Sequence, residues 1–253
     1  LDPLATGLLP ICVGEATKFS NYTTNLDKVY EVEIKFGVET DTGDITGKII
    51  SKKDPYGIDQ GLNKQLKKLE GIHLQMPPMH SAIKKNGKPL YYWARKGVYL
   101  YRDPRRIEIK SINLLNRSEY SAIIEVACSK GTYIRTLVEQ LGRSLGTFAT
   151  VSSLRRLEVG SMKLTTNSCH LEDTKDNIVN TILPCDALLT DIDKIALKPE
   201  EAKKVRNGLS IDYNAHLKNK GLVRIYTDKN LFIGLGLVGN NNMIQPKRLL
   251  ATN

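Results

Sequence analysis

The chain has 253 residues, of which 41% are hydrophobic and 25% charged, and its formal net charge is +10. These values are ordinary for a globular protein of one or two domains. No apolar run approaches the roughly 18 residues that span a bilayer, the start does not resemble a signal peptide, and the four scattered cysteines form no C-x-x-C pair. We therefore expect a reduced, cytoplasmic protein with no membrane contact, no zinc site and no disulfide framework.

The first segment, LDPLATGLLP, places a carboxylate in an apolar turn. An Asp that precedes a Pro is pushed into an extended or turn conformation, so Asp2 projects from a loop. The leucines expected to bury the flanks of this loop are Leu1, Leu4, Leu8 and Leu9. A carboxylate held this way can act as a nucleophile. It can also simply cap the turn at Ala5 and Thr6, and the local sequence alone favours the cap.

Residues 28–37 alternate apolar and polar side chains, which predicts a half-buried strand. A Gly/Thr/Asp turn and a short strand follow in VETDTGDITGKII. Asp41 and Asp44 in this turn resemble a fragment of a calcium loop, but the ligand series is incomplete. We interpret them as turn residues.

The segment DQGLNKQLKKLEG predicts an amphipathic helix over 59–71, with Leu62, Leu66 and Leu69 on one face. A Pro-rich loop then leads into a basic, aromatic helix. Residues 105–115 and 120–129 alternate again and predict a pair of strands.

The helix in CSKGTYIRTLVEQLG is the best specified of the chain. Thr132 is the expected N-cap and Gly142 the expected end. The apolar face consists of Ile134, Leu137, Val138 and Leu141. Arg135 lies off that face in the first turn, so it is free to point towards a cleft.

Residues 186–200 are typical of a linker, and from about residue 193 short strands alternate with Asn/Gly turns. This pattern predicts a small all-β module after a mixed α and β region. Gly234, Gly236 and Gly239 match G-x-G-x-x-G, but no helix or partner acid can follow so near the end of the sequence. We reject dinucleotide binding and attribute these glycines to tight β packing.

One segment carries the whole charge excess. Residues 84–156 contain 15 Lys and Arg against 5 Asp and Glu, a balance of +10, and also eight of the sixteen aromatic residues. Lys and Arg neutralise phosphates, and aromatic rings stack on unpaired bases. The alternative is a solvated basic face over core aromatics; the single stripe favours nucleic-acid binding.

No catalytic triad, P-loop or kinase motif is present, and the four histidines show no metal-ligand spacing. If the chain is an enzyme, we expect it to use Asp, Tyr, Lys and Arg side chains without a cofactor or metal.

Several long stretches, in order, resemble the bacterial TruB family of tRNA pseudouridine-55 synthases. They are LDPLATGLLPICVGEATKFS, DKVYEVEIKFGVETDTGD, PPMHSAIKKNGKPLYYWARKG, CSKGTYIRTLVEQLGRSLG and LRRLEVG. The resemblance implies an α+β fold: a mixed-sheet pseudouridine synthase catalytic domain over 1–190, with an RNA-clamping insertion at about 76–105. A small C-terminal all-β PUA-like domain is expected over 191–253. In the family a segment precedes this motif, so the catalytic domain is expected to lack its N-terminal part and to brace Asp2 less well.

The resemblance implies that the protein isomerises a uridine in the T loop of tRNA to pseudouridine after the base flips into a pocket. Asp2 matches the catalytic aspartate, Tyr30 the tyrosine against the base with a proton-transfer role, and Arg135 the arginine that pairs with the aspartate. Tyr133 and Leu154 match residues lining the uridine pocket, and Lys18 a lysine of the same cleft. Attack by Asp2 on C1′ of the sugar and on C6 of the base both remain open.

The RNA contacts expected in the basic segment come from five side chains: Lys84, Lys85, Arg95, Lys130 and Arg155. His80 stands where the family more often has tyrosine, which puts one peripheral RNA contact in doubt. The expected partner is the tRNA T arm, bound by a monomer without a guide RNA or an obligate protein partner. An RNA-binding module without chemistry remains an alternative; a base methyltransferase is disfavoured because no adenosyl-methionine loop is recognisable.

Overall fold

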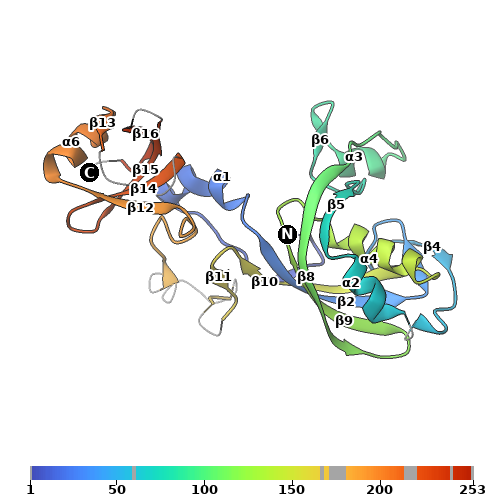
Figure 1. Cartoon of the computed structure of the whole chain (residues 1–253). Coiled ribbons are helices and arrows are strands. Elements are labelled where there is room, and N and C mark those ends of the chain that lie inside the picture. Colours follow the sequence, from blue (N-terminus) through green and yellow to red (C-terminus); the bar gives the residue numbers. More distant parts are fainter. Residues whose placement is uncertain are drawn as a thin grey trace. The chain divides into compact units, whose positions relative to one another are not determined.

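The computed structural model describes residues 2–58, 61–165, 168–170, 181–213, 221–239 and 242–251 (Figure 1). The chain forms two compact units. The first comprises Leu1–Leu9 and Leu26–Leu164, and the second comprises Pro10–Asn25 and Thr165–Asn253. The predicted domain boundary at residues 190 and 191 falls inside the second unit, because two earlier segments group with the C-terminal strands.

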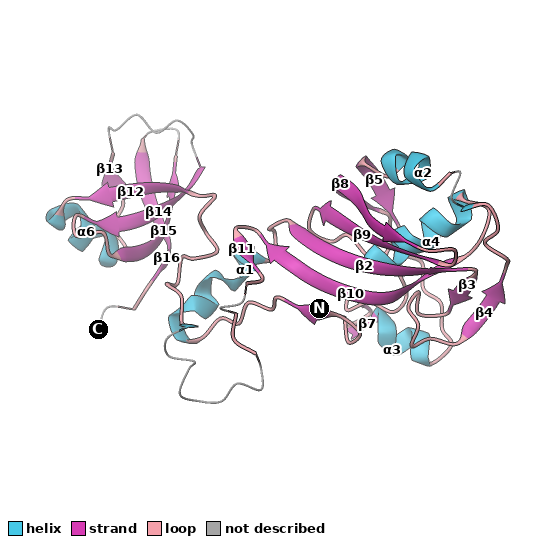
Figure 2. Ribbon diagram, turned by 90° about the horizontal axis from the view of Figure 1, so that it is seen from below, coloured by secondary structure: helices cyan, strands magenta, loops and turns pink. Residues whose placement is uncertain are grey.

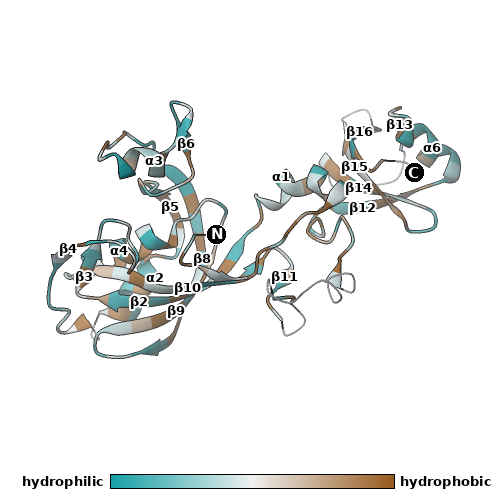
Figure 3. Ribbon diagram, turned by 180° about the vertical axis from the view of Figure 1, so that it is seen from behind, coloured by the Kyte–Doolittle hydropathy of each residue, from teal (hydrophilic) through white to brown (hydrophobic). Residues whose placement is uncertain are grey.

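A mixed seven-stranded sheet forms the centre of the first unit, in the order β1-β10-β2-β9-β8-β5, with β11 paired to β10. The strands are β1 (Thr6–Gly7), β2 (Lys28–Phe36), β5 (Gly71–Gln75), β8 (Arg105–Arg117), β9 (Ser121–Cys128), β10 (Ala149–Val159) and β11 (Met162–Lys163). Pairing is parallel between β1 and β10 and antiparallel elsewhere. In β2 the buried residues Val32, Ile34 and Phe36 alternate with more exposed ones, which confirms the predicted half-buried strand. Brown and teal bands follow this alternation in Figure 3.

Helices α2 (Leu62–Lys68) and α4 (Ile134–Ser144) bury their apolar faces against the sheet, as predicted (Figure 2). Two expected details of α4 are wrong. Its N-cap is Tyr133 rather than Thr132, whose hydroxyl instead donates to the Ser129 carbonyl at 3.0 Å. Gly142 lies inside the helix, where a Cβ would be 2.5 Å from the Ala149 nitrogen, so glycine here allows α4 to approach β10 closely.

Short elements border this sheet. Strands β3 (Val38–Thr40) and β4 (Ile49–Lys52) form one antiparallel ribbon. Strands β6 (Lys84–Lys85) and β7 (Lys88–Pro89) form a tight hairpin, followed by the basic, aromatic helix α3 (Leu90–Arg95). The predicted helix after the Pro-rich loop is thus confirmed.

The second unit holds a five-stranded sheet in the order β12-β14-β15-β16-β13. These strands are β12 (Asp193–Leu197), β13 (Ile211–Asp212), β14 (Gly221–Thr227), β15 (Phe232–Val238) and β16 (Met243–Leu249). The 3-10 helix η1 (Gly14–Phe19) and helix α1 (Ser20–Thr23) belong to the same unit. Gly234 and Gly236 lie within β15, where a Cβ on Gly234 would be 2.8 Å from the Leu249 Cα, so tight β packing explains them.

Helix α6 (Pro199–Arg206) is an element of this unit that strand and turn patterns did not indicate. It begins at a Pro, carries Glu200 and Glu201 in its first turn and buries Ala202 and Val205 against the strands. Its outward surface is polar, and it is largely teal in Figure 3. The short polar run PEEAKKVR is helical because its first turn is capped and because Ala202 and Val205 pack against the strands. A search for alternating strand residues does not detect either feature.

Candidate active site

The N-terminal segment is fastened to the edge of the first sheet. Strand β1 pairs with Arg155 and Arg156 of β10, and the Leu8 nitrogen donates to the Arg156 carbonyl at 2.8 Å. The Arg156 Nε donates in return to the Leu8 carbonyl at 2.7 Å. The Asp2 carbonyl accepts from the Ala5 nitrogen at 2.9 Å, and Ala5 packs against the main core. These contacts hold Asp2 on a turn at the sheet edge.

The flanking leucines behave differently from one another. Leu4 packs against the core as expected, whereas Leu9 is 55% exposed and the expectation for it was wrong. The strand ends at Gly7, so Leu9 already lies beyond the sheet contact.

Gly7 makes this docking possible. Its φ is +90°, and a Cβ would overlap the Arg156 carbonyl oxygen and lie 2.9 Å from the Arg156 nitrogen.

We expect Gly7→Ala to open the β1–β10 pairing, because it combines left-handed strain of about 1–2 kcal/mol with a backbone clash. Hydrogen exchange at the Leu8 amide should accelerate. Gly87→Ala is the matched control, since Gly87 has φ +74° but nothing within 4 Å of a Cβ. Equal exchange at Leu8 in both variants would contradict the clash argument.

Arg135 lies in the first turn of α4 and contacts residues of three different loops. Its side chain is 8% exposed, and its Nε lies 2.8 Å from Asp2 Oδ2. One terminal nitrogen donates to the Thr42 carbonyl at 2.8 Å, and the other donates to the His80 carbonyl at 2.8 Å. Among the described residues the Nε has no hydrogen-bond acceptor, so its contact with Asp2 is an ion pair whose N–H does not point at the oxygen. The expected pairing of Arg135 with Asp2 is therefore present in the structure.

Asp44 is a second carboxylate on the same guanidinium, 3.4 Å from an Arg135 terminal nitrogen. Asp44 Oδ1 also accepts from the Thr42 hydroxyl at 2.9 Å, and from the Thr46 nitrogen at 3.1 Å and hydroxyl at 2.5 Å. Its side chain is 7% exposed, against 35% for Asp2. Asp44 is thus committed to holding the turn and Arg135, whereas Asp2 keeps accessible oxygen lone pairs.

Tyr30 lies on β2 directly opposite Arg156 of β10 and packs against the main core. Burial raises the pKa of its phenol, Cys128 and Asp2 add to the rise, and the hydrogen bond and charge of Arg156 oppose it. A phenol is already protonated at neutral pH, and this shift moves the pKa of Tyr30 further above it.

Tyr133 is clamped at its backbone by Gln75, the last residue of β5. The Gln75 Oε1 accepts from the Tyr133 nitrogen at 2.8 Å, and its Nε2 donates to the Tyr133 carbonyl at 3.1 Å. Gln75 is 5% exposed, so the clamp is buried. Leu154 lies on β10 opposite Val32 and belongs to the main core.

The remaining predicted residues belong to the second unit or lie on the surface of the first. Lys18 belongs to the second unit, where its Nζ contacts Glu15 at 2.7 Å and the Leu249 carbonyl at 3.1 Å. Its place in the Asp2 cleft stays a prediction. Four of the expected RNA-binding side chains are solvent-exposed: Lys84, Arg95, Lys130 and Arg155. The fifth, Lys85, is half-buried.

Three residues of the cluster were not predicted. Asp44 was recognised only as a turn residue, although its Asp-x-Thr context is typical of a carboxylate that accepts local hydrogen bonds. Arg156 shares the buried face of β10 with Leu154, which strand alternation could have indicated. Gln75 has no signal in the sequence, because its partner is 58 positions away.

Among the described residues, no group of three or more His, Cys, Asp or Glu side chains is placed to hold a metal ion. In the same part of the chain, no helix has the length and apolar character to cross a membrane.

Comparison with known proteins matches the chain along nearly its whole length. Residues 1–134 match the model of the TruB family pseudouridylate synthase N-terminal domain. Residues 135–190 match the tRNA pseudouridylate synthase B C-terminal domain, and 194–250 the pseudouridine synthase II TruB C-terminal model.

Two relatives are each named tRNA pseudouridine synthase B. That of Dechloromonas aromatica is 41% identical over 253 residues, covering 99% of this chain and 84% of the relative. That of Mannheimia succiniciproducens is 38% identical over 257 residues, with coverage of 99% and 84%. Among solved structures, a Cbf5-Nop10-Gar1 complex contains a chain with a TM-score of 0.73 at 21% identity, covering 98% of this chain and 74% of that one. This last likeness concerns the fold, and it agrees with the predicted α+β class.

Proposed function

The chain belongs to the TruB family of pseudouridine synthases, which are isomerases, and from this premise we propose that it converts the uridine at position 55 in the T loop of tRNA to pseudouridine. Asp2 is the nucleophile, and the target base flips out of the loop into the site around it.

One observation carries the proposal: a single buried guanidinium holds two carboxylates in unequal states. Asp44 is saturated by three local donors, whereas Asp2 makes one ion pair and stays 35% exposed. A nucleophile needs a fixed position and free lone pairs, and only Asp2 combines both.

The reaction needs a group that attacks the nucleotide and a site that holds the detached base. Attack of the Asp2 carboxylate on C1′ would displace uracil through N1, whereas attack on C6 would form an ester to the base. On the C6 route the N1–C1′ bond breaks after the ester has formed. In both routes C5 then bonds to C1′, the C5 proton leaves to solvent, N1 takes up a proton, and the bond to the Asp2 carboxylate breaks. No electrons are gained or lost overall, so the isomerisation needs no oxidant or reductant.

Tyr30 supplies a ring against the flipped base. We propose that Tyr30 stacks on the base and takes part in proton transfer; burial raises the pKa of its phenol, so the hydroxyl is protonated before the reaction begins. Tyr133 and Leu154 are proposed to line the uridine pocket, and Arg135 to orient Asp2. Lys18 keeps its proposed place in the same cleft.

The exposed cations Lys84, Arg95, Lys130 and Arg155, with Lys85, are proposed to contact phosphates of the T arm. Tyrosine rings lie beneath cations in this region, with Arg95 5.4 Å from the Tyr91 ring centre and Lys96 4.7 Å from that of Tyr92. Such rings can also stack on bases. The protein is proposed to act as a cytoplasmic monomer without a guide RNA.

An isolated T-arm hairpin carrying tritium at C5 of each uridine tests the function. We expect tritium release equivalent to one uridine, and none when position 55 is replaced by cytidine. Release from a different uridine would retain the family activity but contradict the proposed position.

The Gln75 clamp gives a second prediction. Gln75→Leu removes both hydrogen bonds and leaves the Tyr133 nitrogen without its acceptor, so we expect a loss of about 1–3 kcal/mol in unfolding free energy and a raised KM for the hairpin. Urea unfolding and steady-state kinetics measure these effects. Gln140→Leu is the control, because Gln140 is exposed on α4, the helix for which Tyr133 is the N-cap. An unchanged KM in Gln75→Leu would remove Gln75 from the positioning of Tyr133.

A further inference from the structure

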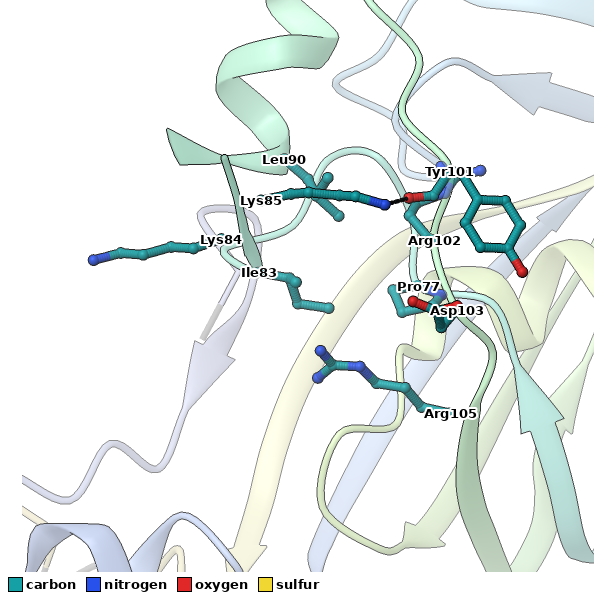
Figure 4. A pocket seen from close by; sticks show the side chains of 9 residues that line it. All are labelled: Pro77, Ile83, Lys84, Lys85, Leu90, Tyr101, Arg102, Asp103 and Arg105. Carbon is teal, nitrogen blue, oxygen red and sulfur yellow. Dashed lines mark hydrogen bonds between the residues drawn. The ribbon is translucent and has the colours of Figure 1, made fainter. Parts of the chain in front are cut away.

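Arginine side chains of the first unit are of two kinds, exposed and buried. Arg105 is exposed: it lines a cavity of about 250 Å³ beside the β6–β7 hairpin, and its guanidinium points into that space (Figure 4). Arg156 on β10 is buried, with only 8% of its surface exposed. A buried guanidinium is withdrawn from solvent, so its N–H donors need acceptors within the protein.

Arg156 holds the segment of chain that carries Asp2. Its Nε donates to the Leu8 carbonyl at 2.7 Å, and its backbone pairs with Gly7 of β1. The Nε carries a single hydrogen, and the bond to Leu8 uses it. The remaining donors of Arg156 are on the two terminal nitrogens.

Tyr30 is the residue directly opposite Arg156 in the β2–β10 pair. Opposite residues of an antiparallel pair project their side chains from the same face of the sheet, so the phenol and the guanidinium are neighbours. A hydrogen bond joins the two side chains. Because the Nε is already used, a terminal nitrogen of Arg156 makes this bond.

The direction of this hydrogen bond follows from the chemistry of the two groups. A guanidinium has donors and no acceptor, so the Tyr30 oxygen must accept. The phenol proton is then left free to point at a different acceptor. Tyr30 is therefore held as a hydrogen-bond donor, with its oxygen fixed from behind by a positive charge.

The other groups that act on the Tyr30 phenol oppose this cation. Burial raises its pKa most, and Cys128 of β9 and the charge of Asp2 raise it further, whereas Arg156 lowers it. Burial also raises the pKa of the Cys128 thiol to about 11, so this thiol is neutral at pH 7. Lys28 on β2 has a pKa lowered by burial and by the charge of Arg156.

We propose that Arg156 is a positioning residue of the reaction, which turns the Tyr30 hydroxyl so that its proton faces the flipped base. The same guanidinium holds the Leu8 carbonyl, so one planar group fixes the phenol relative to the segment that carries Asp2. The inference rests on the proposed function, which supplies the base.

Tyr30→Phe tests the contact while keeping the guanidinium and the aromatic ring. In the protein without RNA, we expect hydrogen exchange at a terminal N–H of Arg156 to accelerate about fivefold, because its acceptor is lost. The Nε–H, bound to Leu8, should exchange as in wild type. Nitrogen-15 NMR of the guanidinium groups measures both rates. Tyr120→Phe is the control, since Tyr120 is an exposed tyrosine of the same unit.

Arg156→Gln tests the consequence for Tyr30. Without the cation we expect the pKa of the Tyr30 phenol to rise above its wild-type value, and single-turnover tritium release to fall about 10-fold. Arg156→Lys keeps the charge, so it should restore this pKa and part of the lost turnover. Fluorine NMR of 3-fluorotyrosine, whose phenol is more acidic, follows the titration. Lys35→Gln, which removes an exposed cation of β2, should change neither quantity.

Three results would overturn the proposal. The first is equal exchange of the terminal N–H groups of Arg156 in wild type and Tyr30→Phe. The second is an unchanged pKa of Tyr30 in Arg156→Gln, and the third is wild-type turnover in that variant. If Arg156→Gln does not fold, the exchange measurement in Tyr30→Phe still decides. Exchange and titration need no RNA, so tritium release by wild type decides the proposed function separately.

Discussion

Asp2→Asn is expected to lower tritium release from the T-arm hairpin by about 10⁴-fold or more, because an amide cannot replace the carboxylate as nucleophile. Hairpin affinity should stay within a few-fold of wild type, since Asp2 contributes no phosphate contact. Single-turnover tritium release and equilibrium binding measure the two quantities.

The matched control is Asp27→Asn, which removes an exposed carboxylate of the same unit that pairs with Lys110. It should turn over at the wild-type rate. If Asp2→Asn also retained turnover, Asp2 would not be the nucleophile. If wild type itself bound the hairpin without releasing tritium, the alternative of an RNA-binding module without chemistry would be favoured.

Arg135→Lys is expected to reduce turnover by about 10²–10³-fold. The four contacts of Arg135, with Asp2, Thr42, Asp44 and His80, require a planar fork, whereas a lysine ammonium is a point charge on a longer flexible stem. Asp2 would then lose its orientation while the positive charge remained.

Arg135→Met should be more destabilising, by about 3–5 kcal/mol, because it leaves buried Asp44 without its cation. Urea unfolding measures this difference. Arg143→Lys is the control on the same helix, since Arg143 is exposed and pairs with Glu39 at the surface. Arg143→Lys should change the free energy of unfolding by no more than about 0.5 kcal/mol. Equal turnover in Arg135→Lys and wild type would show that charge alone, rather than the fork, positions Asp2.

The two Arg135 variants separate two roles of this side chain, orienting Asp2 and neutralising buried Asp44, which a single substitution would not distinguish. Loss of turnover with retained stability in Arg135→Lys reports the orientation of Asp2. Loss of stability in Arg135→Met reports the buried charge of Asp44. Binding affinity should change less than turnover in both, because the contacts of Arg135 are made within the protein.

The sequence by itself determined the elements whose pattern is local. Alternation in residues 28–36 specifies a half-buried strand, and the apolar spacing in α4 specifies the face that packs on the sheet. Long ordered motifs also sufficed for the family. Asp2, although it precedes a Pro in an unremarkable turn, gained its candidate role from that resemblance and not from its neighbours.

Only the tertiary structure decided which side chains meet. Arg135 contacts Asp2, Asp44 and the His80 carbonyl, which lie on three separate loops. Gln75 holds the backbone of Tyr133, which is 58 positions away in the sequence. Lys18 follows Asp2 closely in sequence, yet it packs in the other unit. Local propensity acts over a few residues, whereas strand order and helix docking bring distant side chains together; contacts of this kind therefore leave no periodic signal in the sequence.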